Sequence, residues 1–361
     1  MMDFAGYRLP VRFPEGSIRE HMAVRTACGL FDTCHMPEFI CRGPEALQCI
    51  NYLFTNDYSD LRIGSARYGL MCDENGGILD DLIVHRLAED VYLVPVNAAC
   101  RESDFQWILQ HTGRSGSDAA GRRFDAEWTD ISDEVGTLAL QGPLSERVLV
   151  KVTDPAGIPQ GRFRFSRSAE IGGIPALIAR TGYSGEDGFE IYVPAGRIAE
   201  LWERLLEAGR EDGLQLCGLG SRDTLRIEAG MPLYGKDLDR TVSPAEADLD
   251  YGLNLQSGDF IGRQAVIDRY PPAVRRVGLK VTGSRIIRGG QDIYINEDKI
   301  GRMTSGTYCA YVDAALGMGY IRTEYAVPGQ KVCVDVRGKA VEAVVTELPF
   351  YIPPYKKADA R

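Results

Sequence analysis

Two stretches of strand-type residues flank a short polar segment in the first quarter of the chain. Residues 66–72 and 78–87 are rich in apolar and β-branched side chains, whereas residues 73–77 read Asp-Glu-Asn-Gly-Gly. Asn75, Gly76 and Gly77 readily adopt the positive backbone torsions of a tight reversal. The pattern therefore predicts a β-hairpin.

Two adjacent carboxylates open the second strand of this hairpin. Alternation places Asp80 on the face of Ile78 and Leu82, and Asp81 on the opposite face with Leu79. Both faces are mainly apolar, and an unpaired carboxylate is costly to desolvate there, so at least one aspartate is expected to have a specific partner. The alternative is that both aspartates bind backbone amides of the turn.

Shorter patterns predict where other elements begin. Ser17 and Glu20 have the spacing of a capping box, at the start of a helix with an apolar stripe of Ile18, Met22 and Ala23. Pro95 makes the strand at residues 91–96 an edge strand or a bulged one. Ser221 is the expected N-cap of a helix that ends near Glu228.

A strand, a Gly-Pro pair and a helix follow one another twice, at residues 38–53 and 137–150. This repeat indicates two related αβ units on antiparallel sheets, not a doubly wound α/β fold. From residue 277 onward, short β-type runs alternate with Gly- and Pro-containing turns, which predicts a small all-β domain such as a barrel. Residues 270–272, Tyr-Pro-Pro, form the expected linker.

Composition narrows the class of protein. A chain of 361 residues is long for one core, and 44% hydrophobic and 25% charged residues are typical of soluble globular proteins. The net charge of −10 argues against a nucleic-acid partner. Nine cysteines without a C-x-x-C pair and four histidines without an H-x-x-x-H motif predict reduced thiols and no metal. No signal peptide or apolar run of ~20 residues is found, so a cytoplasmic protein without a membrane span is expected.

A glycine-rich segment at residues 180–190 ends in another carboxylate within an apolar stretch. Its glycines allow close backbone approach, but it has neither the Gly-Lys-Ser/Thr of a Walker A loop nor the G-x-G-x-x-G order. Glu190 ends the segment inside an otherwise apolar strand. Its carboxylate could accept two parallel N–H bonds from an amidine-like ring edge, or it could pair with Arg222. Residues 218–223 also resemble an anion site at a helix N-terminus.

An ordered series of short motifs gives these observations a common meaning. Together they strongly resemble the T-protein of the glycine cleavage system, a tetrahydrofolate-dependent aminomethyltransferase, over nearly the whole chain. The motifs in order include Gly29-Leu30-Phe31-Asp32, Thr55-Asn56-Asp57, Gly76-Gly77-Ile78-Leu79-Asp80-Asp81-Leu82, Val96-Asn97-Ala98-Ala99, Gln141-Gly142-Pro143, residues 180–190 and 218–230, Pro232-Leu233-Tyr234-Gly235, Asp259-Phe260-Ile261-Gly262, Thr304-Ser305-Gly306-Thr307 and Leu348-Pro349-Phe350-Tyr351.

The resemblance implies an α+β fold of three domains in a cloverleaf around a central folate cavity. Two αβ domains have antiparallel sheets, and the third is barrel-like. The expected limits are residues 1–41 with 131–245 for the first domain, 42–130 for the second, 246–272 for a connecting segment and 273–361 for the C-terminal all-β domain.

The resemblance also implies the roles of individual residues. Asp81 is the expected catalytic residue beside folate N5, and Glu190 is expected to bind the pterin edge. Four further residues match positions that line the site, namely Tyr68, Asn97, Tyr183 and Arg222. Tetrahydrofolate is the implied co-substrate and the lipoylated carrier, H-protein, the implied partner, with the chain a monomer or weak dimer.

The chain departs from the family pattern at residues 34–37, at Cys100 and at residues 308–312, where carrier or substrate could be recognised. An alternative function is therefore a tetrahydrofolate-dependent demethylase that takes a methyl group from a small S-, O- or N-methyl donor. A third alternative is a non-catalytic folate-binding factor. Relatives of that kind carry a Lys-Gly-Cys motif in the C-terminal half, which this chain lacks.

Overall fold

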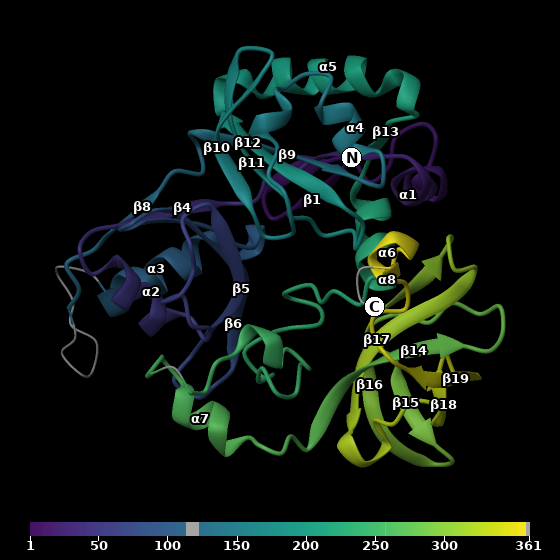
Figure 1. Cartoon of the computed structure of the whole chain (residues 1–361). Coiled ribbons are helices and arrows are strands. Elements are labelled where there is room, and N and C mark those ends of the chain that lie inside the picture. The colour runs from purple at the N-terminus through teal and green to yellow at the C-terminus, as the bar shows by residue number, and fades with distance from the viewer. Residues whose placement is uncertain (113–122, 257, 359–361) are drawn as a thin grey trace.

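The computed structural model describes residues 1–112, 123–256 and 258–358. It contains two αβ units on largely antiparallel sheets and a closed barrel of six strands. Figure 1 shows these three bodies around a middle region, which is crossed by the green segment that follows helix α6 (Leu219–Glu228). The predicted α+β class, its three-part arrangement and its C-terminal barrel are confirmed.

The first unit contains a six-stranded sheet in the order β10-β11-β12-β9-β3-β13. Neighbouring strands are antiparallel except β3 and β13, which are parallel. Leu201 and Leu205 of helix α5 are fully buried in its core. The strands and helices are β3 (Gly29–Asp32), β9 (Val135–Gln141), β10 (Phe165–Ile171), β11 (Ile174–Ala179), β12 (Gly188–Pro194), β13 (Gln215–Cys217), α1 (Ser17–Thr26), α4 (Ser145–Leu149) and α5 (Ile198–Gly209).

The second unit contains a five-stranded sheet in the order β5-β6-β7-β4-β8. Pro95 is the last residue of β7, and β7 lies between β6 and β4, so the edge-strand prediction is wrong. The missing proline N–H is tolerated because pairing ends at this residue. The strands and helices are β4 (Glu38–Arg42), β5 (Ser65–Cys72), β6 (Ile78–Ala88), β7 (Val91–Pro95), β8 (Glu127–Asp130), α2 (Ala46–Leu53) and α3 (Arg101–Thr112).

The third body is a closed barrel in the order β14-β17-β16-β15-β18-β19. Its strands are β14 (Val274–Val281), β15 (Asp292–Ile295), β16 (Asp298–Cys309), β17 (Ala314–Arg322), β18 (Lys331–Asp335) and β19 (Ala340–Thr346). Outside the three bodies lie β1 (Met2–Phe4), β2 (Tyr7–Leu9), α7 (Arg263–Asp268) and α8 (Pro354–Ala358). The domain limits at residues 41, 130, 245 and 272 stay a prediction, and residues 113–122 of the second domain lie outside the described residues.

The predicted hairpin consists of β5 and β6, but its alternation is interrupted at Leu79. The register shifts where Met71 pairs with Asp80 and Cys72 pairs with Ile78, which leaves Leu79 as an extra residue. Leu79 therefore packs in the same cluster as Leu82, whereas Ile78 packs in another. The predicted grouping of faces is wrong at this point because a bulge adds one residue to one strand.

Two predicted N-cap residues are also wrong, although α1 begins at Ser17. Gly16 and Gly218 are the N-cap residues of α1 and α6, and neither Ser17 nor Ser221 caps its helix. The Glu20 carboxylate instead accepts the backbone N–H of Gly218 at 3.0 Å and the Ser221 hydroxyl at 2.8 Å. The predicted anion site at this helix N-terminus is thus filled by a side chain of the protein itself.

Helix α1 also buries a different face from the one predicted. Ile18 is 61% exposed, and Met22 and Ala23 are only partly buried. The buried side chains are Glu20, His21, Val24 and Arg25. A polar face is buried here because other elements supply partners for each charged group, which periodicity alone does not reveal.

Candidate functional site

The six predicted site residues come from both αβ units. Tyr68 and Asp81 lie on β5 and β6, Asn97 follows β7, and the other three lie in the 180–187 loop, on β12 and on α6. All six side chains are partly exposed, whereas most neighbours on the same strands are fully buried. Each of the six residues therefore reaches solvent.

Asp81 is held by two donors. Tyr68 Oη donates to Asp81 Oδ2 at 3.1 Å, and Asn97 Nδ2 donates to Oδ1 at 2.9 Å. Burial and then the charge of Asp80 raise the pKa of Asp81 to about 7, although both hydrogen bonds favour the ionised form. A carboxyl group with this pKa can give or take a proton near neutral pH.

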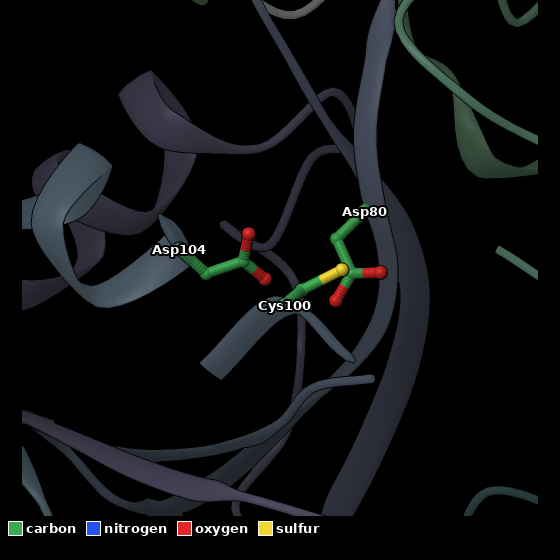
Figure 2. A group of neighbouring side chains, drawn as sticks. All are labelled: Asp80, Cys100 and Asp104. Atoms are coloured by element: carbon green, nitrogen blue, oxygen red, sulfur yellow. The ribbon is translucent and has the colours of Figure 1, made fainter. Parts of the chain in front are cut away.

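Asp80 lies directly behind this carboxylate and is fully buried. Its two oxygens accept the backbone N–H of Asn97 at 2.9 Å and the side-chain amide at 2.8 Å. The alternative that both aspartates bind the turn is wrong, because Asp73 accepts the turn N–H groups of Asn75 and Gly77 at 2.9 and 3.0 Å. Figure 2 shows Asp80 on β6 with Cys100 and Asp104 beside it.

Tyr251 completes this side of the site, and sequence reasoning missed it. Its ring stacks on Tyr68 with centroids 5.2 Å apart, and 66% of the residue remains exposed, so the ring forms part of an accessible wall. Gly252 permits the contact, because a Cβ there would lie 2.9 Å from the Tyr68 ring. An aromatic residue next to glycine in an irregular segment was the one available signal.

Glu190 and Arg222 do not form the ion pair that was one alternative. One Glu190 oxygen accepts the Thr181 hydroxyl, and burial raises the pKa of Glu190. The Arg222 guanidinium lies 4.9 Å from the centre of the Tyr183 ring. No Arg222–Glu190 ion pair is found within the described ranges, although the Arg222 charge lowers the pKa of Glu190 in opposition to burial.

The 180–187 loop is fixed by its neighbours. Gln141 Nε2 donates to the carbonyl of Thr181 at 3.1 Å, and the Ser184 hydroxyl donates to Gln141 Oε1 at 2.7 Å. A Cβ at Gly182 would lie 2.0 Å from Gln141 Oε1, so glycine is needed for this close approach. The Tyr183 hydroxyl donates to the carbonyl of Pro232, which ties the loop to the middle segment.

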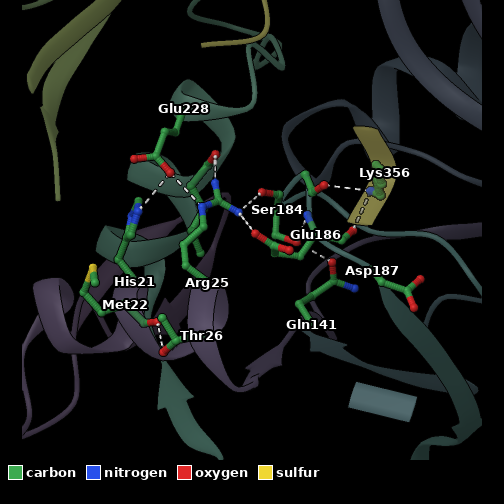
Figure 3. Close-up of polar contacts among 12 residues, drawn as sticks. His21, Met22, Arg25, Thr26, Gln141, Ser184, Glu186, Asp187, Glu228 and Lys356 are labelled. Atoms are coloured by element: carbon green, nitrogen blue, oxygen red, sulfur yellow. Dashed lines mark hydrogen bonds and ion pairs between the residues drawn. The ribbon is translucent and has the colours of Figure 1, made fainter. Parts of the chain in front are cut away.

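Arg25 on α1 clamps the same loop to α6. Its Nη1 donates to Glu186 Oε1 at 3.0 Å and to the carbonyl of Ser184 at 2.8 Å, while its Nε donates to Glu228 Oε2 at 2.7 Å. Figure 3 shows the guanidinium between these partners, with Lys356 on the far side of the loop. The three charged side chains are completely buried, so the clamp joins separate elements through ion pairs shielded from water.

A cavity of about 510 Å³ opens beside these residues. It is lined by the 180–187 loop, by Tyr251 and Arg276, and by C-terminal residues that include Tyr351. Because Tyr251 stacks on Tyr68, the cavity wall leads directly to the partner of Asp81. None of the six predicted site residues lines this cavity itself, and none lines a larger hollow of about 710 Å³ around Lys151 and Arg204.

Two segments that depart from the family pattern, residues 34–37 and 308–312, lie close to this region. Tyr311, from the segment 308–312, packs edge-on against Tyr351 of the cavity wall at 4.9 Å between ring centres. His35 is buried beneath Phe4 at 5.5 Å, and burial, reinforced by the Arg222 charge, lowers its pKa to about 4. The imidazole is therefore neutral at physiological pH.

Comparisons with known proteins agree with this geometry. The family model of the GCVT N-terminal domain matches residues 1–257, and that of the glycine cleavage T-protein C-terminal barrel domain matches residues 275–351. A curated aminomethyltransferase from Caldanaerobacter subterraneus subsp. tengcongensis is 40% identical, with 99% of this chain and 93% of the relative covered. One from Bacillus cereus is 42% identical, with 97% and 93% covered.

A solved structure extends the similarity to three dimensions. The crystal structure of glycine cleavage system aminomethyltransferase T from Bartonella henselae superposes with a TM-score of 0.87 at 34% identity, covering 98% of this chain and 94% of that one. Within the residues described above, no helix has the length and apolarity needed to cross a membrane. By sequence and by fold, the chain belongs to the glycine cleavage T-protein family of aminomethyltransferases.

Proposed function

We propose that the chain transfers the methylene group of an aminomethyl-lipoyl carrier protein to tetrahydrofolate, with release of ammonia. The carrying observation is the Asp81 carboxylate, which two donors fix at the edge of accessible space and whose pKa is raised to about 7. Tetrahydrofolate supplies a nucleophilic amine, N5, that takes up the methylene. Asp81 orients this amine and accepts its proton or stabilises the positive charge that develops.

The residues around Asp81 fit a folate co-substrate. Among the described residues, Glu190 accepts one hydroxyl, from Thr181, which leaves acceptor capacity for the N–H groups of a pterin edge. Tyr183, Arg222, Tyr68 and Asn97 line the remaining space in this proposal. Two of them are pre-arranged by contacts outside the ligand, because the Arg222 guanidinium stacks on Tyr183 and the Tyr183 hydroxyl binds a carbonyl.

The donor enters through the 510 Å³ cavity in this proposal. The opening is walled by segments of the first unit, of the barrel and of the chain that follows the barrel. Its four basic residues slightly outnumber its three acidic ones, namely Arg162, Arg180, Arg276 and Lys356 against Glu186, Asp187 and Asp248. A lipoyl arm is long and mostly apolar, so it needs such an open passage to reach Asp81. We further propose that the chain works in the cytoplasm with a lipoylated carrier, as a monomer or weak dimer.

The test is ammonia release by the purified chain mixed with tetrahydrofolate and aminomethylated, lipoylated carrier. Folate-dependent ammonia in a 1:1 ratio to methylenetetrahydrofolate supports the proposal, and Asp81→Asn should abolish it while folate still binds. If the wild-type chain binds folate by calorimetry but releases no ammonia, the proposal fails. Small S-, O- and N-methyl donors would then be tried, with methyltetrahydrofolate as the product measured.

A further inference from the structure

A cluster of three buried polar side chains lies behind Asp81. Asp80 on β6, Cys100 in the short helix Ala98–Cys100 and Asp104 on α3 bring one oxygen or sulfur atom each within 4.8 Å of one another. Their exposed fractions are 0%, 3% and 2%. Figure 2 shows the Asp104 carboxyl group directed toward Asp80, with the Cys100 side chain beside Asp80.

The two carboxyl groups differ sharply in their donors. Asp80 accepts two N–H bonds from Asn97, whereas the buried Oδ2 of Asp104 accepts none within the described part of the chain. One carboxyl oxygen of Asp104 nevertheless lies within 4.8 Å of one of Asp80, and the Asp104 carboxyl group is directed toward Asp80 (Figure 2). Two ionised carboxylates buried this close together repel each other, so a proton on one of them stabilises the pair.

The surroundings place this proton on Asp104. Burial and then the charge of Asp80 raise the pKa of Asp104 to about 11. The other titratable or charged groups that act on Asp104 or share its surroundings are Asp81, Cys100, Tyr234 and Arg240, and Arg240 lowers the pKa of Asp104. Burial raises the pKa of Asp80 as well, but the donors from Asn97 on both of its oxygens oppose that shift, so Asp80 is the member of the pair that carries the negative charge.

A metal ion is the less suitable occupant of this cluster. It would require a Cys100 thiolate, but burial and the charge of Asp80 raise the pKa of this thiol. Both Asp80 oxygens already accept hydrogen bonds from Asn97. A proton on the Asp80–Asp104 pair requires neither a thiolate at Cys100 nor the loss of the hydrogen bonds from Asn97.

We propose that Asp104 is a positioning residue for the transfer reaction: as a neutral carboxylic acid it donates a hydrogen bond to Asp80, keeps Asp80 ionised and thereby fixes Asn97 between Asp80 and Asp81. This inference rests on the proposed role of Asp81. The chain of contacts runs from α3 through two carboxylates and one amide to the reacting edge of the site.

Two substitutions distinguish the effect of losing the hydrogen-bond donor at residue 104 from the effect of replacing the carboxyl group as such. Asp104→Asn keeps an N–H donor for Asp80, so Asp80 stays ionised and the acid limb of kcat/KM stays at the wild-type pH. Asp104→Ala removes the donor, so Asp80 takes up a proton and its charge no longer raises the pKa of Asp81. The acid limb should then move down by about 1 pH unit. Glu102→Gln, an exposed change on the same helix, is the matched control.

Three measurements decide the proposal. The pH dependence of kcat/KM is compared among these variants, and bound metal is determined by mass spectrometry. The infrared C=O band of a protonated aspartate is recorded with ¹³C-aspartate labelling at pH 9, where Asp81 is ionised and Asp104 still holds its proton. We expect a band in the wild type that Asp104→Asn removes and Glu102→Gln retains. The absence of that band, a stoichiometric metal lost with Asp104→Asn, or an acid limb shifted alike in Asp104→Asn and Asp104→Ala would overturn the proposal.

These readouts also separate this proposal from the proposed function. If the wild-type chain releases no ammonia with carrier and folate, the proposed function fails, yet the infrared band and the ¹³C titration of the Asp81 carboxyl still test Asp104. If Asp104→Ala does not fold, the wild-type and Asp104→Asn spectra suffice. If the wild-type chain releases ammonia normally but the infrared band is missing, the proposed role of Asp104 is refuted and the proposed function stands.

Discussion

Asn97 joins the two adjacent aspartates through a single amide nitrogen, which lies 2.9 Å from Oδ1 of Asp81 and 2.8 Å from Oδ1 of Asp80. The same nitrogen lies 3.1 Å from the backbone carbonyl of Asp81. Because the residue is anchored by its own backbone N–H as well, its side chain has little freedom to move. The position of the Asp81 carboxylate on β6 thus depends on Asn97, which follows the neighbouring strand β7.

Replacing Asn97 by alanine should therefore impair catalysis more than folding. The change removes a donor that favours ionised Asp81, so the pKa of Asp81 should rise and the acid limb should move to higher pH. Loss of the fixed geometry should lower kcat by about 100-fold at pH 7. Ammonia-release kinetics across pH measure both effects. Asn75→Ala, in the exposed turn, is the control, and equal kcat values for the two variants would contradict the argument.

Replacing Glu190 by alanine should weaken tetrahydrofolate binding with little effect on kcat at saturation. A charged contact to two N–H groups is lost, so Kd should rise at least about tenfold, or ~1.4 kcal/mol. Titration calorimetry with tetrahydrofolate measures the change. Glu203→Ala, an exposed change on α5, should leave Kd unaltered, and an unchanged Kd for Glu190→Ala would remove this residue from the pterin site.

The raised pKa of Asp81 makes a prediction about stability. Its folded-state pKa of about 7 lies above the ordinary value of 3.8, so ionisation of this group favours the unfolded chain. This cost begins near pH 4, grows up to about pH 7 and is constant above. Asp81→Asn should therefore raise Tm at pH 8 by more than at pH 5, although it abolishes turnover. Thermal unfolding at both pH values tests this, and an equal or smaller gain at pH 8 would contradict it.

The sequence pattern predicted elements best where local chemistry decides the conformation. The hairpin forms as predicted, but of the three turn residues only Gly76 has a positive φ, of 76°, whereas Asn75 and Gly77 do not. The bulge at Leu79 was not predictable, because it depends on how β6 pairs with β5. A one-residue shift then changes which side chains share a face with the two aspartates.

The sequence pattern identified some residues of the site, but it did not reveal which side chains contact one another there. Asp81 and Glu190 stand out as carboxylates in apolar strands, but their partners Tyr68, Asn97 and Thr181 are brought close only by sheet pairing and loop closure. Roles for Tyr68 and Asn97 came from the family resemblance, not from spacing. Tyr251 was missed because its segment has no periodicity to mark it.

The buried charged side chains of α1 were likewise not predictable from the sequence pattern, and they lead to a final prediction. The guanidinium of Arg25 is fully buried with the carboxylates of Glu186 and Glu228, so Arg25→Met should leave two buried anions without their main partner. Breaking such a buried pair costs about 3–5 kcal/mol. Arg19→Met, on the same helix, removes an exposed pair with Glu15, which precedes the helix, and should cost about 0–1 kcal/mol. Urea unfolding of both variants measures the difference. Equal losses would mean that the clamp does not hold the 180–187 loop, whereas a large loss for Arg25→Met with weaker folate binding would tie the clamp to the site.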